Sequence, residues 1–98
     1  MRKVRISEVV WYRLEELADH MIDGFKLSED AAMRRIDRFS EFILALGLPV
    51  NHSVCRFERW RSLGYRCAVF EKNWVLAYEV FDDGIIVRDM SHTSTLTG

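Results

Sequence analysis

Hydrophobic and polar positions alternate in three short runs across the second half of the chain, from Gly64 to His92. Each run is rich in Val, Ile, Phe, Tyr and Trp, and the runs are separated by polar connections around Lys72-Asn73 and Asp82-Gly84. Alternation of this kind is typical of β-strands with one buried face, and short polar connections join antiparallel neighbours. The pattern therefore predicts a three-stranded antiparallel meander.

The two connections of this meander differ in their turn chemistry. Asp83-Gly84 is a pair that accepts positive φ angles readily, so we expect it to form a tight hairpin turn. The connection around Lys72-Asn73 contains no glycine and is a less defined turn. In the middle run one face carries Trp74, Leu76, Tyr78 and Val80, and the other Val75, Ala77 and Glu79.

The first half of the chain predicts one short strand and two helices. Lys3-Val4-Arg5-Ile6 alternates charged and apolar residues, which indicates a strand pairing with the meander. Ser7 suits the N-cap of a helix that ends near Gly24. The apolar stripe of this helix consists of Val10, Leu14, Leu17 and Met21, widened by Trp11, Ala18 and Phe25.

Ser28 is the expected N-cap of a second helix, which Gly47 and Pro49 end. Its apolar positions recur at steps of four and three residues: Ala32, Ile36, Phe39, Ile43 and Leu46. Only Gly24 to Leu27 separates the two helices, so they pack as an antiparallel hairpin. The expected fold is a single α+β domain over residues 1–98, with the helices on one sheet face and the other face partly open.

Charge is balanced overall but uneven along the chain. The net charge is −1, whereas proteins that mainly grip nucleic acid are usually basic. From Asn51 to Arg66, four arginines face only Glu58, a local charge of +3. No apolar run approaches the roughly 20 residues that span a bilayer, and no apolar stretch follows the basic start, so we expect a cytoplasmic protein without membrane contact.

The positive segment is the strongest candidate for binding a target. Between Val50 and Leu63 the periodicity fails, and the sequence is compatible with a loop, a short helical turn or an irregular edge strand. Arginine and tryptophan side chains engage phosphates and stack on bases, which makes Arg56, Arg59, Trp60 and Arg61 the candidate target-binding residues. In the alternative interpretation the aromatic side chains tuck beneath the loop and the arginines remain in water.

The two cysteines, Cys55 and Cys67, do not form the framework of a disulfide-rich domain. His52 and Cys55 have the spacing of a metal-binding pair, but no second close pair follows them. We therefore expect buried or half-buried thiols, with no metal site and no cofactor.

Several of these features together resemble the RelE/ParE toxin superfamily of bacterial type II toxin–antitoxin modules, also called plasmid-stabilisation proteins. They are Gly64-Tyr65-Arg66, the strand Trp74 to Val80, the turn Asp82-Asp83-Gly84, an Ile-rich strand and His92 near the end. The resemblance covers nearly the whole chain. It implies a toxin that a cognate antitoxin protein neutralises.

The resemblance also implies where catalysis would occur, because several members of the superfamily cleave mRNA in the ribosome. Arg66 and His92 are the candidate catalytic residues, with Glu58 as a further candidate. However, Val75 stands where the cleaving members have a strand arginine, and Thr93 follows His92 where some have a tyrosine.

This departure favours the ParE-like branch, whose members poison DNA gyrase by stoichiometric binding. The alternatives are a ribosome-dependent mRNA interferase and a non-toxic interaction module of the same fold.

Overall fold

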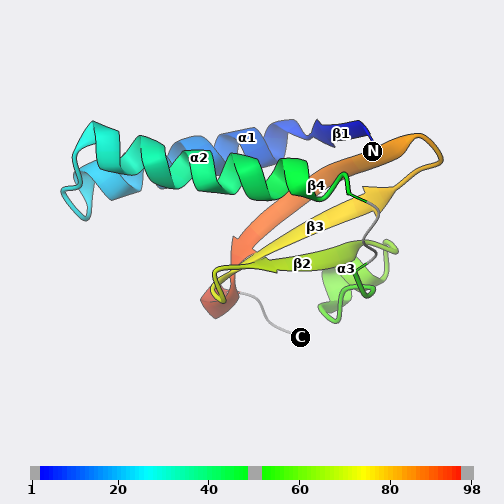
Figure 1. The fold of residues 1–98 in the computed structure, drawn as a ribbon. Helices are drawn as coiled ribbons and strands as arrows, with labels where there is room; N and C mark the ends of the chain where they lie inside the picture. Colours follow the sequence, from blue (N-terminus) through cyan, green and yellow to red (C-terminus); the bar gives the residue numbers. More distant parts are fainter. Residues whose placement is uncertain (1–2, 49–51, 96–98) are drawn as a thin grey trace.

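The computed structural model describes residues 3–48 and 52–95, which form a four-stranded mixed sheet beneath a helical hairpin (Figure 1). The strands lie in the order β1-β4-β3-β2. β1 pairs with β4 in parallel, and the other neighbours are antiparallel. The elements in chain order are β1 (Lys3–Ile6), α1 (Glu8–Asp23), α2 (Glu29–Ala45), α3 (Glu58–Arg61), β2 (Arg66–Phe70), β3 (Trp74–Val80), β4 (Gly84–His92) and a 3-10 turn (Thr93–Thr95). The predicted α+β fold is confirmed.

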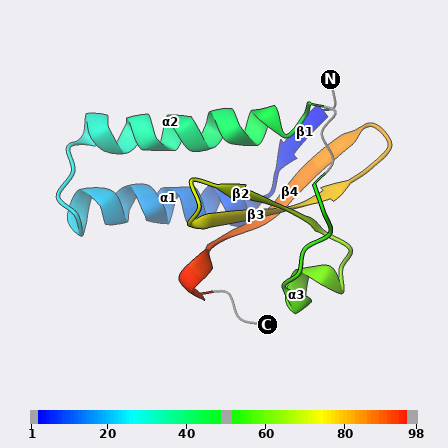
Figure 2. The ribbon, with the colours of Figure 1, turned by 60° about the horizontal axis from the view of Figure 1, so that its bottom comes forward.

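Both predicted helix starts are capped by serine side chains. Ser7 Oγ accepts a hydrogen bond from Val10 N at 3.4 Å, and Ser28 Oγ accepts one from Ala31 N at 3.1 Å. Each bond satisfies an amide that has no partner within the first helical turn. α1 and α2 run antiparallel, and their far end extends beyond the sheet (Figures 1 and 2). Pro49, expected just after α2, lies outside the described residues.

The main core fills the space between the hairpin and the sheet. Its helical members include Val10, Leu14, Phe39 and Ile43, and its strand members include Leu76, Tyr78, Ile85, Val87 and Met90. The predicted alternation along β3 is confirmed, because Leu76 and Tyr78 face the helices. The predicted width of the α1 stripe is wrong, since Trp11 and Phe25 are 52% and 67% exposed. Phe25 lies at the end of the helical hairpin that extends beyond the sheet, here called the hairpin overhang, so no strand of the described chain lies beneath it (Figure 1).

A smaller second core covers the opposite face of the sheet. Trp60 and Cys55 pack there against Val75 and Ala77 of β3. The segment that had no clear periodicity thus contains the four-residue helix α3, preceded by an isolated bridge between Val54 and Arg66. Because Val54 pairs with the start of β2, the chain before α3 returns to the edge of the sheet.

The hairpin predicted at Asp82-Gly84 is present, but the positive φ angles lie in the other connection. Glu71 and Lys72 adopt positive φ angles of 51° and 68° in the connection without glycine. Gly84 does not adopt a positive φ; it begins β4 beside β1, where a Cβ atom would lie 2.3 Å from the carbonyl oxygen of Lys3. The glycine is therefore needed for close strand approach and not for left-handed backbone.

Candidate functional site

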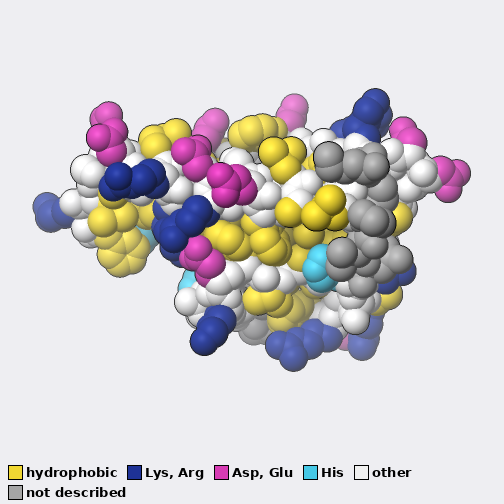
Figure 3. Space-filling model, in the orientation of Figure 1, with side chains coloured by type: hydrophobic (Ala, Val, Ile, Leu, Met, Phe, Trp, Pro, Cys, Tyr) yellow, Lys and Arg dark blue, Asp and Glu magenta, His cyan; other side chains and the backbone are white. Residues whose placement is uncertain are grey.

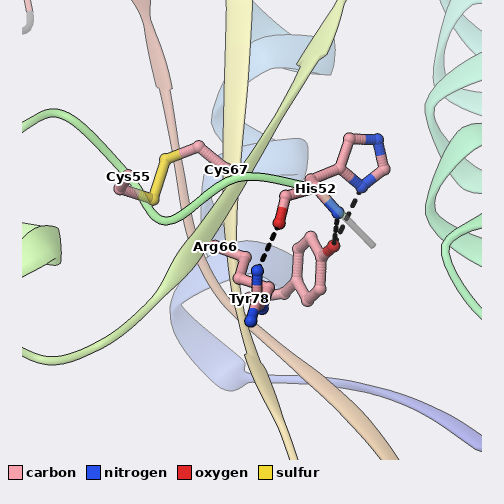
Figure 4. The surroundings of a disulfide bond; sticks show 5 residues. All are labelled: His52, Cys55, Arg66, Cys67 and Tyr78. Atoms are coloured by element: carbon pink, nitrogen blue, oxygen red, sulfur yellow. Dashed lines mark hydrogen bonds between the residues drawn. A yellow bond between two sulfur atoms is a disulfide. The ribbon is translucent and has the colours of Figure 1, made fainter. Parts of the chain in front are cut away.

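Arg66 lies at the start of β2 and is held by a backbone carbonyl. Its Nη1 donates a hydrogen bond to the carbonyl oxygen of His52 at 2.6 Å. Tyr78, which pairs with Arg66 across the sheet, accepts a hydrogen bond from His52 N at 3.2 Å and contacts His52 Nδ1 at 2.8 Å (Figure 4). The Arg66 guanidinium thus helps to fasten the connection after α2 to the sheet.

His92 lies at the end of β4, on the helix side of the sheet. Its ring packs edge-on against Trp74 with centroids 5.2 Å apart, and its Nδ1 lies 2.8 Å from Ser94 Oγ. After His92 the chain continues into a 3-10 turn, Thr93–Thr95. The His92 side chain is therefore held in place by Trp74 and Ser94.

The structure does not bring the two candidate catalytic residues together. Arg66 pairs with Tyr78 and His92 pairs with Trp74, four positions away along β3. This offset places them roughly 13 Å apart along the strands, and they also lie on opposite sides of β3, about 10 Å apart. Glu58, the further candidate, is in α3 beside the other sheet face and contacts Arg61 at 3.9 Å. No common reaction centre forms from these three residues.

The position without the strand arginine is filled by packing. Val75 is 2% exposed and contacts the cluster that contains Cys55 and Trp60. An apolar residue there allows the α3 region to lie directly on the sheet. A phosphate would meet a covered surface at this position.

The four candidate target-binding residues form an arginine segment, residues 56–61, in and before α3. The Arg56 guanidinium lies 5.3 Å from the centre of the Phe57 ring, and the Arg59 guanidinium lies 4.7 Å from that of Trp60. Both distances are in the range of cation–π contacts. Trp60 itself is only 3% exposed, so in this arrangement the indole anchors the segment and is not available to stack on a base.

The arginines themselves remain exposed. Arg56, Arg59 and Arg61 are all on the surface, and Lys and Arg side chains gather along the lower edge in Figure 3, the side on which α3 lies in Figure 1. Stacking leaves the N–H edge of a guanidinium directed outward, where it donates to carboxylate or phosphate oxygens. The segment therefore exposes positively charged hydrogen-bond donors, which stack on aromatic rings packed beneath them.

The expectation of free thiols is wrong, because Cys55 and Cys67 form a disulfide (Figure 4). Their sulfur atoms are 1.99 Å apart and their Cα atoms 4.9 Å. The Val54–Arg66 bridge places the two cysteines side by side, a contact that residue spacing alone does not reveal. Within the described residues, no group of three or more His, Cys, Asp or Glu could hold a metal ion.

The resemblance leads us to expect an antitoxin-binding groove beside the helical hairpin and the open sheet face, without naming its residues, and a groove runs beneath the hairpin overhang. It has a volume of about 430 Å³, and its lining is mainly apolar and aromatic, with Leu17, Met21, Phe25, Leu27 and Trp74. His20, Arg35 and His92 lie at its margin. Phe25 belongs to this lining, but the helical pattern assigned it to the core, so the sequence did not mark it as part of a groove.

No helix in residues 3–48 and 52–95 has the length and hydropathy of a membrane span. Comparison with protein-family profiles gives no match, and comparison with curated protein sequences also gives none.

Solved structures do share this arrangement of helices and strands, and they define the fold as that of ParE-like and YafQ-like proteins. A structure described as the chromosomal ParDE TA system from P. aeruginosa matches with a TM-score of 0.76 and 12% identity, covering 94% of this chain and 96% of that one. YafQ from E. coli strain BL21(DE3) matches with a TM-score of 0.58 and 17% identity over 100% of both chains. The E. coli DinJ–YafQ complex gives 0.57 and 16%, again over 100% of both chains.

The fold expected from the resemblance to the RelE/ParE superfamily is thereby confirmed. The TM-score is higher for the ParDE structure than for the two YafQ structures.

Proposed function

We propose that residues 1–98 are one toxin domain of a bacterial type II toxin–antitoxin module, which acts in the cytoplasm by binding its target stoichiometrically. The observation that carries this proposal is the fold shared with the ParDE structure over 94% of the chain. The separation of Arg66 and His92 supports binding over mRNA cleavage, because these two candidates do not form a pair of proton donor and acceptor.

The proposed partner is a cognate antitoxin, and the groove beneath the overhang is its proposed docking site. Two of the matched structures come from complexes or systems of paired proteins, ParDE and DinJ–YafQ. The groove has the apolar lining that accepts one face of an amphipathic segment. The outer edge of β1, the first strand of the sheet, also offers backbone groups for strand addition.

The proposed target is DNA gyrase, and the proposed contact surface is the arginine segment. Its exposed guanidinium groups lie on the sheet face opposite the hairpin, so antitoxin and target surfaces differ. This arrangement lets the groove be altered without changing the target surface. Inhibition of DNA supercoiling by the purified chain, at a ratio near one to one, is the expected biochemical result.

Expression in bacteria tests the toxin role and the antitoxin partner together. The chain alone is expected to arrest growth, and co-expression with the product of the adjacent small gene is expected to restore growth and yield a co-purifying complex. A chain that permits normal growth contradicts the toxin role. A chain that arrests growth but ignores the adjacent gene product contradicts the proposed partner.

A pair of variants locates the docking site. Phe25→Asp is expected to keep toxicity and lose rescue, because it places a charge on an exposed part of the groove lining. Met33→Asp is the matched control, since Met33 is 53% exposed on α2 and does not line the groove. Equal rescue of both variants would place the antitoxin elsewhere.

A further inference from the structure

We propose that the Cys55–Cys67 disulfide is a redox switch that orders the arginine segment, so that oxidation favours target binding and reduction weakens it. The inference extends the proposed function, on which its cellular consequence rests. The conformational part concerns only the residues between the two cysteines and is testable on the purified chain.

The disulfide closes the chain around the arginine segment. Cys55 immediately precedes Arg56, and Cys67 lies in β2 beyond the end of α3, at a sequence separation of 12. Two backbone hydrogen bonds reinforce the closure, from Cys55 N to Tyr65 O at 2.8 Å and from Cys67 N to Ser53 O at 3.2 Å. The loop thus has one covalent link and a two-bond ladder at its base.

Inside this loop the backbone is held by short-range hydrogen bonds and by one buried anchor. α3 has four residues, and its N-cap, Phe57, makes no side-chain capping bond. The backbone hydrogen bonds between residues 57 and 65 span only three to five positions, and isolated helices of this length do not persist in water, because nucleation outweighs the few bonds gained. The buried contact with the sheet comes from Trp60, which packs with Cys55 itself against Val75 and Ala77, with the half-buried Phe57 and Tyr65 beside it. Breaking the disulfide therefore weakens both the closure and the packing of this anchor.

The rest of the fold does not depend on the disulfide. The main core is a separate cluster, built from the hairpin and the opposite sheet face, and neither cysteine belongs to it. His52 remains fastened by Tyr78 and Arg66 just before the loop. Reduction is therefore expected to loosen residues 56–65 locally while the sheet persists.

The chemical step is thiol–disulfide exchange with a dithiol reductant of the thioredoxin class. Its thiolate attacks Sγ of Cys67, which is half-buried on the edge strand β2, whereas Cys55 is 1% exposed. A mixed disulfide forms with Cys67, and Cys55 Sγ leaves and takes a proton. The second thiol of the reductant then displaces Cys67 as a thiolate, which is also protonated. The protein gains two electrons and two protons, and the reductant becomes a disulfide.

The compartment decides which form is populated. Disulfides persist in oxidising surroundings and are usually reduced in the cytosol, where those that form are often transient and redox-sensing. A toxin domain in the cytoplasm would therefore be mainly in the dithiol form. Under oxidative conditions the disulfide would form and order the arginine segment. The local position of the bond makes such a change reversible without unfolding the domain.

Hydrogen exchange on the purified chain, with and without dithiothreitol, tests the proposal. Amides of residues 56–65 are expected to exchange about tenfold faster or more after reduction, whereas those of β3 and β4 stay unchanged. The double variant Cys55→Ala/Cys67→Ala is expected to exchange like the reduced protein and to ignore the reductant. If this variant does not fold, reduction of the unaltered chain decides the question alone.

Unchanged exchange after complete reduction, verified by alkylation of both thiols, would overturn the switch. Global unfolding on reduction would also overturn it, because the bond would then be a structural requirement of the whole domain. Binding of the purified chain to gyrase is expected to weaken about tenfold on reduction, a shift of about 1.4 kcal/mol. Absence of any gyrase binding contradicts the proposed target, and the exchange result still decides the switch.

Discussion

At the scale of single residues, a polar contact between His52 and Tyr78 links the connection after α2 to the sheet. Tyr78 is completely buried in the main core, yet its hydroxyl meets both the backbone N and the ring Nδ1 of His52. A buried phenol needs a partner, because an unsatisfied hydroxyl costs about 1–3 kcal/mol. Within the described residues, His52 supplies both of these partners, and this contact fixes where the chain re-enters the sheet after α2.

Tyr78→Phe is therefore expected to lower the free energy of unfolding by about 1–2 kcal/mol, because His52 N and Nδ1 lose their shared partner. Tyr12→Phe is the matched control, since Tyr12 is 63% exposed and its hydroxyl is solvated. Urea denaturation of the three proteins measures both changes. Equal stability of the two variants would show that water replaces the phenol at no cost.

Single residues also show what sequence reasoning can and cannot supply. Ser7 and Ser28 were predicted as caps because capping depends on a local hydrogen bond within one turn. Gly84 was misassigned because its role depends on Lys3, a residue 81 positions earlier that approaches only in the folded sheet. Local chemistry is readable along the chain, whereas a close approach between distant strands is not.

At the scale of elements, periodicity decided how much of the fold was predictable. The two helices and three meander strands each direct one face toward the main core, and this burial imposes a repeat that the sequence must carry. The segment with the candidate target site has no such repeat, because its order comes from local turns, one disulfide and a small aromatic cluster around Trp60. The sequence therefore indicated its residues and charge but left its conformation, and the burial of Trp60, undetermined.

The arginine segment gives the prediction at this scale. Arg59→Ala/Arg61→Ala is expected to abolish growth arrest, while the free energy of unfolding changes by no more than about 0.5 kcal/mol, as for exposed residues. The matched control is Arg34→Ala/Arg38→Ala, which removes the same charge from the exposed surface of α2. Growth assays and thermal melting provide the two measurements. Full toxicity of the Arg59/Arg61 variant would show that the segment is ordinary solvated surface.

At the scale of the whole molecule, the sheet keeps Arg66 and His92 apart, and the α3 region covers Val75. Loss of one electrostatic donor to a transition state lowers a rate by a factor of about 10²–10³, and here the partners of such a donor are also dispersed. Among the described residues, the three candidates Arg66, His92 and Glu58 therefore do not meet in one centre.

Transcripts from arrested cells are accordingly expected to show no codon-phased cuts by primer extension, and His92→Ala is expected to remain toxic. The opposite result, discrete cuts that vanish in His92→Ala, would establish the mRNA interferase alternative and make His92 its acid or base. Thermal melting of His92→Ala controls for the loss of its contact with Trp74.

Because β1 pairs in parallel with β4, the rate of protein synthesis limits when the sheet can be completed. Lys3 can pair only after Gly84 has been synthesised, so β1 cannot join the sheet before β4 is made. At synthesis rates of about 5–20 residues per second, that wait lasts roughly 4–16 s. A nascent or truncated chain that stops short of β4 cannot complete the sheet, and activity is therefore expected to arise in a single step once β4 has been synthesised.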